Sequence, residues 1–399
     1  ARRVLSERFP HEKAGIEKFF GVIRAIHGEV AKLPRENWKL LFLLPVFPLL
    51  FRNLVFREKA TVGQFLDSII GDEDLKLALL GNLVYYHDDP YTLSLIFFAV
   101  AQGSYFTGGG HYVKGGSQKL SDYLAGVIRS CGGEVLYRHL VTGILTKDGK
   151  AIGVRYRKTT GGDEEGEEAV GRAIIANASI PSVARDLLSP GDSGPLRSLV
   201  DRLEVAPSLT TLYLGFKRPV RELGNPSYTT FLFDGGVRNL SDMRENRRAD
   251  YSLRNVSFVD FSLIDSGLTP EGKSFGSMVC VDYLPEWEGL GPDEYREKKE
   301  QVAKTFIRRL ETLIPGIAEE IEYREVATPK TIRRFTLNPG GTAYGFAQTT
   351  GQAGRKRMKL RPPVGNLYFA SAWLFSGGFS GAIMGGHFCA EEVWKRLRK

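Results

Sequence analysis

The sequence contains few of the residues that build disulfide frameworks and metal sites. It has only three cysteines, Cys131, Cys280 and Cys389, which lie far apart in a chain of 399 residues. None of its six histidines stands at a spacing typical of a zinc site. These absences exclude a disulfide scaffold, predict no metal site, and indicate a reducing compartment such as the cytoplasm.

Apolar runs long enough to span a membrane are absent as well, and the start of the chain has no secretory signal pattern. One stretch, residues 40–51, has twelve residues without a charge but contains two prolines. A spanning helix needs about 20 apolar residues, so this stretch is too short to cross a bilayer. Three interpretations stay open: a buried core segment, the wall of an apolar tunnel, or a peripheral membrane anchor with Lys39, Arg52 and Arg57 near the headgroups.

The charge excess is modest. Lysine and arginine total 54 and aspartate and glutamate 46, which gives a formal net charge of +8. The densest basic run, residues 355–361, has no RNA-binding aromatic signature beside it. We therefore expect a solvated basic surface and no nucleic-acid partner.

Motifs of two common enzyme classes are missing. No G-x-S-x-G nucleophile turn occurs, so serine hydrolase chemistry has no support. The glycine-rich segment near the end of the chain cannot open a nicotinamide-binding unit of about 30 residues, because only eighteen residues follow Gly381. Residues 85–91, "YYHDDPY", are typical of a turn with solvated acids, and a proton-transfer role is the alternative.

The pattern of apolar residues divides the chain into four segments of an α/β protein. Residues 1–112 are predicted to be helical, with Thr61 as a helix cap. Residues 113–205 read as a helix closed by Gly132, a hairpin through Asp148-Gly149, and a short strand. Residues 206–338 predict an aromatic-rich sheet followed by a helix from about residue 295 to 314. Residues 339–399 end in a strand, a glycine-rich bend and a last helix.

Four glycines, Gly377, Gly378, Gly381 and Gly385, fall within nine residues at the start of that last helix. A helix interior disfavours each of them by about 1 kcal/mol relative to alanine. One interpretation is that bare N–H groups at the positive end of the helix hold an anionic ring, such as a reduced flavin. The other is a tight turn followed by close packing of the helix.

Four segments of the chain resemble the phytoene desaturase family, which includes carotenoid isomerases and retinol saturases. They are "GNLYFASAWLFSGGFSGAIMGG" (365–386), the block at 112–154, "AIIANAS" (173–179) and "GGTAYGF" (340–346). The resemblance implies an FAD domain of Rossmann type, interleaved with a substrate domain of mixed sheet plus helices. It also implies action on a long apolar polyene or isoprenoid lipid by desaturation, saturation or redox isomerisation.

The resemblance implies a set of cofactor-binding residues: Gly115, Gly116, Val141, Ser371, Gly378, Gly381, Ala382 and Ile383. The backbone near Val141 would lie beside the adenosine, and residues 381–383 would present N–H groups to the pyrimidine edge of the flavin. Gly115 and Gly116 would form the crossing between the two domains. Valine at position 381 would then block FAD while leaving the chain folded.

Substrate contacts are predicted around the same ring. Trp373, Phe375 and Phe379 flank the glycines and are expected near it. The aromatic strands between residues 209 and 283, together with residues 40–56, would line a long hydrophobic tunnel. No catalytic side chain is predicted, because the flavin itself carries hydride chemistry.

The family's opening motif, G-x-G-x-x-G, does not occur in these 399 residues. We therefore expect the family's N-terminal nucleotide-binding portion to be supplied by a second polypeptide or a separated segment. Alone, the chain is expected to bind FAD poorly or not at all. Two alternatives follow: a lipid-binding or scaffold subunit that has lost its cofactor, and an enzyme like the flavin amine oxidases.

Overall fold

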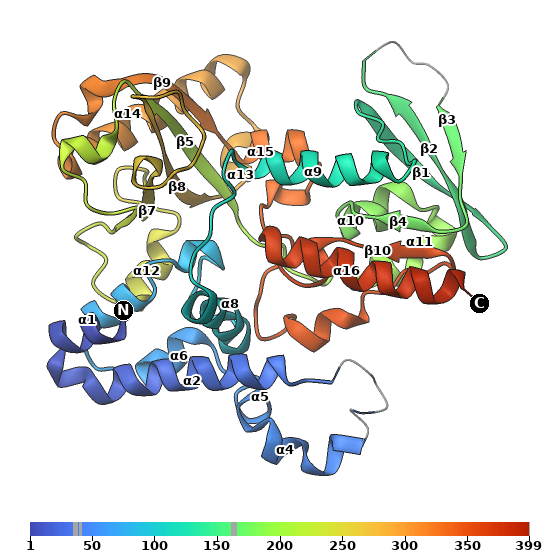
Figure 1. The fold of residues 1–399 in the computed structure, drawn as a ribbon, viewed down its shortest axis with the longest axis horizontal. Helices are drawn as coiled ribbons and strands as arrows, with labels where there is room; N and C mark the ends of the chain where they lie inside the picture. Colours follow the sequence, from blue (N-terminus) through green and yellow to red (C-terminus); the bar gives the residue numbers. More distant parts are fainter. Residues whose placement is uncertain (35–38, 40–41, 161–165, 399) are drawn as a thin grey trace.

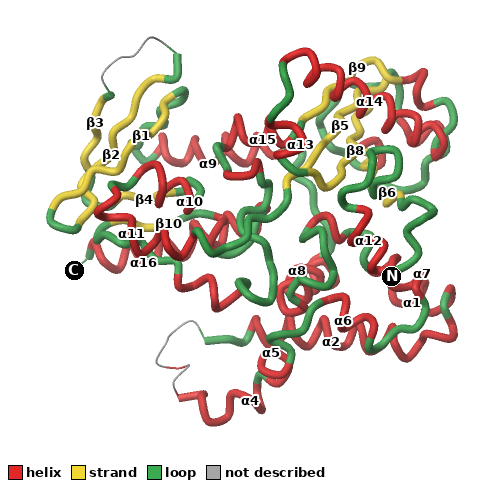
Figure 2. Tube along the Cα trace, turned by 180° about the vertical axis from the view of Figure 1, so that it is seen from behind, coloured by secondary structure: helices red, strands yellow, loops and turns green. Residues whose placement is uncertain are grey.

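The structure is a computed structural model that describes residues 1–34, 39, 42–160 and 166–398. Its elements form a helical part, an antiparallel sheet part and an α/β part (Figure 1). The chain starts in the helical part and ends in the α/β part, so the two termini lie far apart (Figure 2).

The helical part packs around the long helix α2. Its helices are α1 (Arg2–Arg8), α2 (Lys13–Ala31), α4 (Phe47–Leu50), α5 (Arg52–Phe56), α6 (Val62–Asp67), α7 (Glu73–Leu79) and α8 (Leu95–Gly108). Ile16, Phe19 and Ile23 recur on one face of α2 and are buried against Leu66 and Phe98. Thr61 caps α6 as predicted, and Gln64 completes the capping box.

The second part is a five-stranded sheet in the order β6-β7-β8-β5-β9. Its elements are β5 (Ser208–Phe216), β6 (Thr229–Leu232), α12 (Leu240–Asn246), β7 (Val256–Asp260), β8 (Ser274–Asp282), α13 (Pro285–Glu288), α14 (Pro292–Leu313), β9 (Ile321–Ala327) and α15 (Pro329–Thr336). Every strand pair that the sheet describes is antiparallel, where a mixed sheet was predicted. Phe306 and Leu310 of α14 cover one face and pack on Leu212 and Phe258.

The α/β part contains two small sheets. Its elements are α9 (Ser117–Ser130), β1 (His139–Lys147), β2 (Lys150–Lys158), β3 (Glu167–Val170), β4 (Ile174–Ala176), α10 (Ile180–Ser182), a π-helical turn (Val183–Leu187), α11 (Pro190–Val200), β10 (Leu367–Phe369) and α16 (Gly378–Leu397). β1, β2 and β3 form an antiparallel meander, with Asp148 and Gly149 at positive φ in its first turn. β4 and β10 pair in parallel although they are far apart in sequence.

The sheet part and the α/β part are tied together where the chain passes between them. The N–H of Gly115 donates to the carbonyl of Ser266 at 2.7 Å, and the N–H of Ala206 donates to the carbonyl of Gly345 at 2.8 Å. Gly115 and Gly116 both need positive φ, at 84° and 86°, which favours glycine. The second of these bonds holds the segment at residues 340–346 close to the start of β5.

Candidate functional site

The segment between β10 and α16 forms the centre of the candidate site. Ser371 is buried at the end of β10, and its hydroxyl accepts a hydrogen bond from the N–H of Trp373 at 3.3 Å. α16 then begins at Gly378 without a side-chain cap and without an acidic residue in its first turn. The N–H groups of Gly378, Phe379 and Ser380 thus have no partner in the helix, and they carry its positive partial charge.

Because α16 begins at Gly378, its unpaired N–H groups lie earlier in the chain than the predicted donors at residues 381–383. Ala382 and Ile383 lie one turn further along α16, where a backbone N–H bonds to the carbonyl four residues earlier. Their N–H groups therefore donate to carbonyl groups within the helix. Gly381 is the fourth residue of the helix and directly follows the three residues whose N–H groups have no helical partner. Of the predicted residues, Gly378 keeps a free and exposed donor.

The buried glycines of α16 serve the protein's own backbone. A Cβ built on Gly381 would stand 1.7 Å from the carbonyl oxygen of Ser376, and one on Gly385 would stand 3.1 Å from that of Ala370. The expectation that valine at position 381 would leave the chain folded is therefore wrong. Gly381 allows the tight turn, and Gly385 allows α16 to pack on the end of β10.

The three aromatic residues of this segment have different surroundings. Trp373 is buried and meets Phe346 edge to face, with ring centroids 4.7 Å apart, so it is a core residue rather than a wall of an open tunnel. Phe375 packs on Phe388 at 5.5 Å. Phe379 is 55% exposed at the start of α16 and is the most exposed member of this trio.

A buried arginine supports the turn from behind. Arg357 is 1% exposed, and its guanidinium donates to the carbonyl of Ala347 at 2.6 Å and stands 5.4 Å from the ring of Phe346. Burial lowers the pKa of Arg357 to about 10. The basic run at 355–361 was predicted to be solvated, but its Arg357 is buried. This side chain binds the loop that carries Phe346.

Tyrosines that the sequence did not single out lie next to the turn. A Cβ on Gly377 would stand 2.6 Å from the Cα of Tyr344, so the two backbones touch. Burial and then the nearby phenols of Tyr85 and Tyr105 raise the pKa of Tyr344, and burial and then Tyr105 raise the pKa of Tyr85 to about 12. The phenols of Tyr344 and Tyr85 therefore stay neutral at physiological pH.

A row of rings continues from these tyrosines along the five-stranded sheet. Tyr228 and Tyr112 both pack against Phe261, with centroids 5.8 and 5.3 Å apart. Phe261 packs on Phe275 at 5.2 Å, and Phe275 stacks on Tyr213 at 6.1 Å. Tyr112, Tyr213 and Tyr228 are each between 37 and 40% exposed. We call this row, together with Tyr85, Tyr105 and Tyr344, the aromatic wall.

The remaining predicted cofactor residues lie in other elements. Gly115 and Gly116 lead into α9, as the crossing between domains requires. Val141 is on β1, pairs with Tyr156, and is 39% exposed. Ser371, Gly378 and Gly381 thus lie in the segment between β10 and the first turn of α16. Gly115, Gly116 and Val141 lie in other elements.

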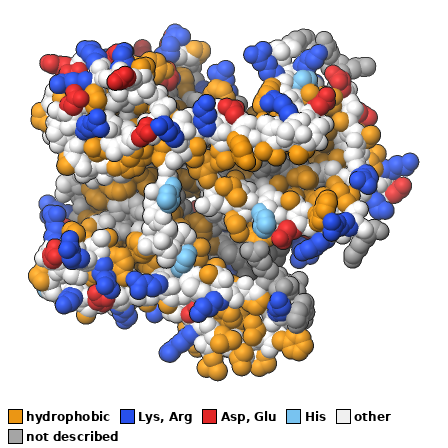
Figure 3. Space-filling view, in the orientation of Figure 1, with side chains coloured by type: hydrophobic (Ala, Val, Ile, Leu, Met, Phe, Trp, Pro, Cys, Tyr) orange, Lys and Arg blue, Asp and Glu red, His pale blue; other side chains and the backbone are white. Residues whose placement is uncertain are grey.

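An apolar face is left open in the α/β part. α9 buries none of its residues, although Leu124, Val127 and Ile128 lie on one side and are 43 to 50% exposed. β4 pairs with β10 on one edge and with no described strand on the other, and its Ile175 is 50% exposed. Figure 3 shows hydrophobic side chains gathered below α9. Parallel strands are normally covered on both sides, so we call this surface the open α/β face.

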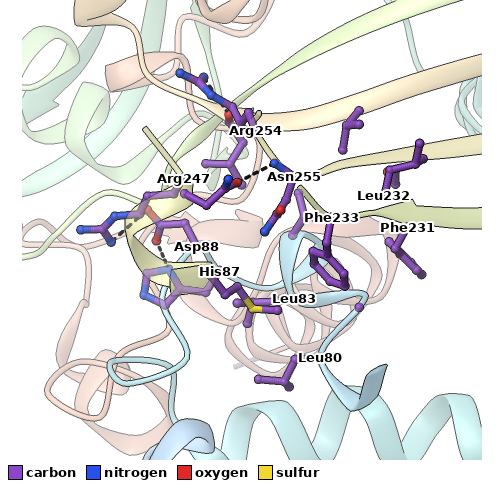
Figure 4. Close-up of a pocket in the computed structure, with 17 residues that line it drawn as sticks. Leu80, Leu83, His87, Asp88, Phe231, Leu232, Phe233, Arg247, Arg254 and Asn255 are labelled. Carbon is purple, nitrogen blue, oxygen red and sulfur yellow. Dashed lines mark hydrogen bonds and ion pairs between the residues drawn. The ribbon is translucent and has the colours of Figure 1, made fainter. Parts of the chain in front are cut away.

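The segment "YYHDDPY" is not a solvated turn. His87, Asp88 and Asp89 are buried, between 3 and 8% exposed. Nδ1 of His87 lies 2.7 Å from Asp88, and Arg247 lies 3.3 Å from the other oxygen of that carboxylate (Figure 4). The adjoining cavity of about 50 Å³ has room for water but not for a substrate, which needs several hundred. This cluster joins the helical part to the sheet.

The Asp88 cluster predicts a pH dependence of stability. Burial by itself raises the pKa of Asp88, but the contacts with His87, Tyr283 and Arg247 together outweigh burial and bring the pKa to about 2. Because the folded pKa lies below the ordinary value of 3.8, the stabilisation of about 2 kcal/mol is present above pH 4 and is lost as the pH falls through 2.

Urea unfolding between pH 7 and pH 2 measures this contribution. Asp88→Asn should lower the free energy of unfolding at pH 7, and its difference from the wild type should shrink toward pH 2. Asp265→Asn, at an exposed ion pair with Lys114, should leave the unfolding free energy nearly unchanged. Equal pH slopes for wild type and Asp88→Asn would contradict the assignment.

The turn fits the pyrimidine edge of a flavin, which has both acceptor and donor atoms. The first turn of α16 supplies unpaired N–H donors. Gln348 is 3% exposed, its amide N–H donates to the carbonyl of Phe375 at 3.0 Å, and its Oε1 has no partner among the described residues. A buried orphan acceptor and a set of free donors thus lie at either end of the same short segment.

Comparison with known proteins agrees with this fit. Residues 44–394 match the model of the flavin containing amine oxidoreductase family, and the chain belongs to that family. It is 28% identical over 398 residues to prolycopene isomerase 1 of an Oncidium hybrid cultivar, covering 96% of this chain and 64% of the relative. It is 24% identical over 426 residues to all-trans-retinol 13,14-reductase of Macaca fascicularis, covering 98% of this chain and 67% of the relative.

Solved structures share the fold at low sequence identity. Cyclohexylamine oxidase from Brevibacterium oxydans has a TM-score of 0.57 at 16% identity, covering 96% of this chain and 75% of that one. A redesigned putrescine oxidase has a TM-score of 0.62 at 15% identity, covering 97% and 76%. These likenesses confirm the predicted interleaved α/β fold. The chain spans 64% of the length of the first curated relatives that it matches.

Proposed function

We propose that this chain is the larger part of an FAD-dependent oxidoreductase that acts on a long apolar polyene or a related isoprenoid lipid. The observation that carries the proposal is the uncapped start of α16 next to the aromatic wall. The names of the relatives support this substrate class, since prolycopene and retinol are both polyenes.

In this proposal, the N–H groups of Gly378, Phe379 and Ser380 hold the electron-rich edge of the flavin, and Gln348 accepts a hydrogen bond from it. Bound FAD supplies hydride exchange with the substrate. The aromatic wall binds and orients the polyene, because its rings offer apolar area. Desaturation, saturation and redox isomerisation are all compatible with these contacts.

The adenosine and pyrophosphate of FAD need a further portion with the G-x-G-x-x-G turn. We propose that this portion, on a second polypeptide or a separated segment, adds a strand to the free edge of β4 and covers the open α/β face. The apolar side of α9 supports the proposal, because an amphipathic helix with no buried residue gains stability only from a partner. We likewise propose residues 113–205 and 339–399 as the flavin domain, 1–112 and 206–338 as the substrate domain, and a reducing compartment such as the cytoplasm as the location.

The test is to co-express the chain with the nucleotide-binding portion and to record the visible spectrum of the purified assembly. We expect the bands of oxidised flavin, and conversion of a cis-polyene under reducing or oxidising conditions. A colourless assembly would favour the scaffold alternative. A yellow assembly that oxidises cyclohexylamine or putrescine and ignores polyenes would support the amine oxidase alternative instead.

A further inference from the structure

The described part of the apolar stretch in the helical part forms a projecting tip. Leu40 and Leu41 lie outside the described residues, and the tip is formed mainly by a 3-10 turn (Leu44–Val46), α4 and α5 (Figure 1). Large apolar side chains are exposed there: Phe42, Leu44, Val46, Leu49, Leu50, Val55 and Phe56. Leu49 is 82% and Phe56 73% exposed, and the cluster stands out at the bottom of Figure 3. The expected roles as core or tunnel wall therefore do not apply to these residues.

Polar bonds at its base hold this tip in place. One carboxylate oxygen of Glu29 accepts from the Asn53 side chain at 2.6 Å, and the other accepts from the N–H of Leu54 at 3.0 Å. Phe51 is buried and packs on Phe47, with centroids 4.5 Å apart. The exposed side chains are thus presented by an anchored pair of short helices.

Positive charge predominates around the tip. No aspartate or glutamate occurs between residues 37 and 57, and Arg52 is exposed between the two helices. Exposed Lys32 and Lys59 flank the segment, and the exposed Glu58 beside Lys59 is the acid nearest to it in sequence on that side. A second copy of the same tip would meet this positive rim with like charge, whereas a surface that is apolar inside and anionic outside would complement it.

We propose that this tip docks on a lipid bilayer that contains anionic lipids. Leu44, Leu49 and Phe56 enter the boundary between headgroups and acyl chains, and Arg52 lies at the phosphates. No helix within the described residues is both long and apolar enough to cross a membrane. Docking needs no flavin, and the chain by itself is sufficient to test it.

The experiment is co-sedimentation of the full chain with vesicles of phosphatidylcholine, with and without phosphatidylglycerol. We expect binding to the anionic vesicles that weakens in high salt. Leu44→Ser, Leu49→Ser and Phe56→Ser together should reduce partition by at least about tenfold, and Arg52→Gln by about fivefold on anionic vesicles only.

Matched variants on other surfaces serve as controls. Val4→Ser, Val170→Ser and Phe335→Ser together remove equally exposed apolar side chains, and Arg308→Gln removes an exposed arginine of α14. These controls should bind vesicles as the wild type does. Absence of wild-type binding, equal losses in control and tip variants, or a tip variant that instead breaks up a dimer would each overturn the proposal.

Discussion

Gly381→Ala is expected to lower the free energy of unfolding by about 3 kcal/mol. This is the largest effect expected for replacing any glycine of α16 by alanine. The added Cβ would fall 1.7 Å from the carbonyl oxygen of Ser376, which is backbone and cannot rotate away. The turn before α16 must therefore open, and the first-turn N–H groups must move with it. Flavin binding by the assembled protein should fall together with stability.

Gly386→Ala is the matched control in the same helix. A Cβ on Gly386 meets nothing within 4 Å, so alanine should raise the free energy of unfolding by up to about 1 kcal/mol through helix propensity. Urea denaturation of the two variants measures both effects. If both substitutions changed stability equally, the close approach of Ser376 to Gly381 would not be the reason for a glycine at that position.

Local sequence signals predicted much of the fold. The hairpin at Asp148-Gly149 has the positive φ values that its turn type demands, and Gly132 follows α9 at φ 81°. The helix expected from residue 295 to 314 is α14, Pro292–Leu313. These features depend on backbone preferences and on periodicity within one segment, which a single sequence records.

Features that depend on distant partners were not predictable in the same way. His87 and Asp88 look like a solvated turn, and only the contacts with Arg247 and Tyr283 show why they are buried. The apolar stretch around Leu49 looks the same in sequence whether it is core or exposed tip.

The candidate site itself stays a prediction, and the sequence indicated only part of its geometry. The glycine-rich segment was identified, but the direction of the missing Cβ at Gly381 required coordinates. Tyr344 lay within a quoted segment without being singled out, and Tyr85 and Tyr105 belong to the helical part. Such rings have no characteristic spacing, because the fold gathers them from separate elements.

A pair of substitutions at Phe379 separates the backbone donor from the side chain. Proline is tolerated in the first turn of a helix, where its missing N–H breaks no helical bond. Phe379→Pro and Phe379→Ala both remove the exposed ring, and only the former removes the N–H group. The difference between the two variants therefore reports on the donor alone.

The decisive measurement is the flavin content of these two variants in the complete assembly, read as visible absorbance per protein. If the main-chain N–H groups in the first turn of α16 bind the flavin ring, the proline variant should bind flavin at least about tenfold more weakly than the alanine variant. This is the loss expected for one hydrogen bond to a charged group. Equal flavin content in the two would show that the cofactor is held somewhere else.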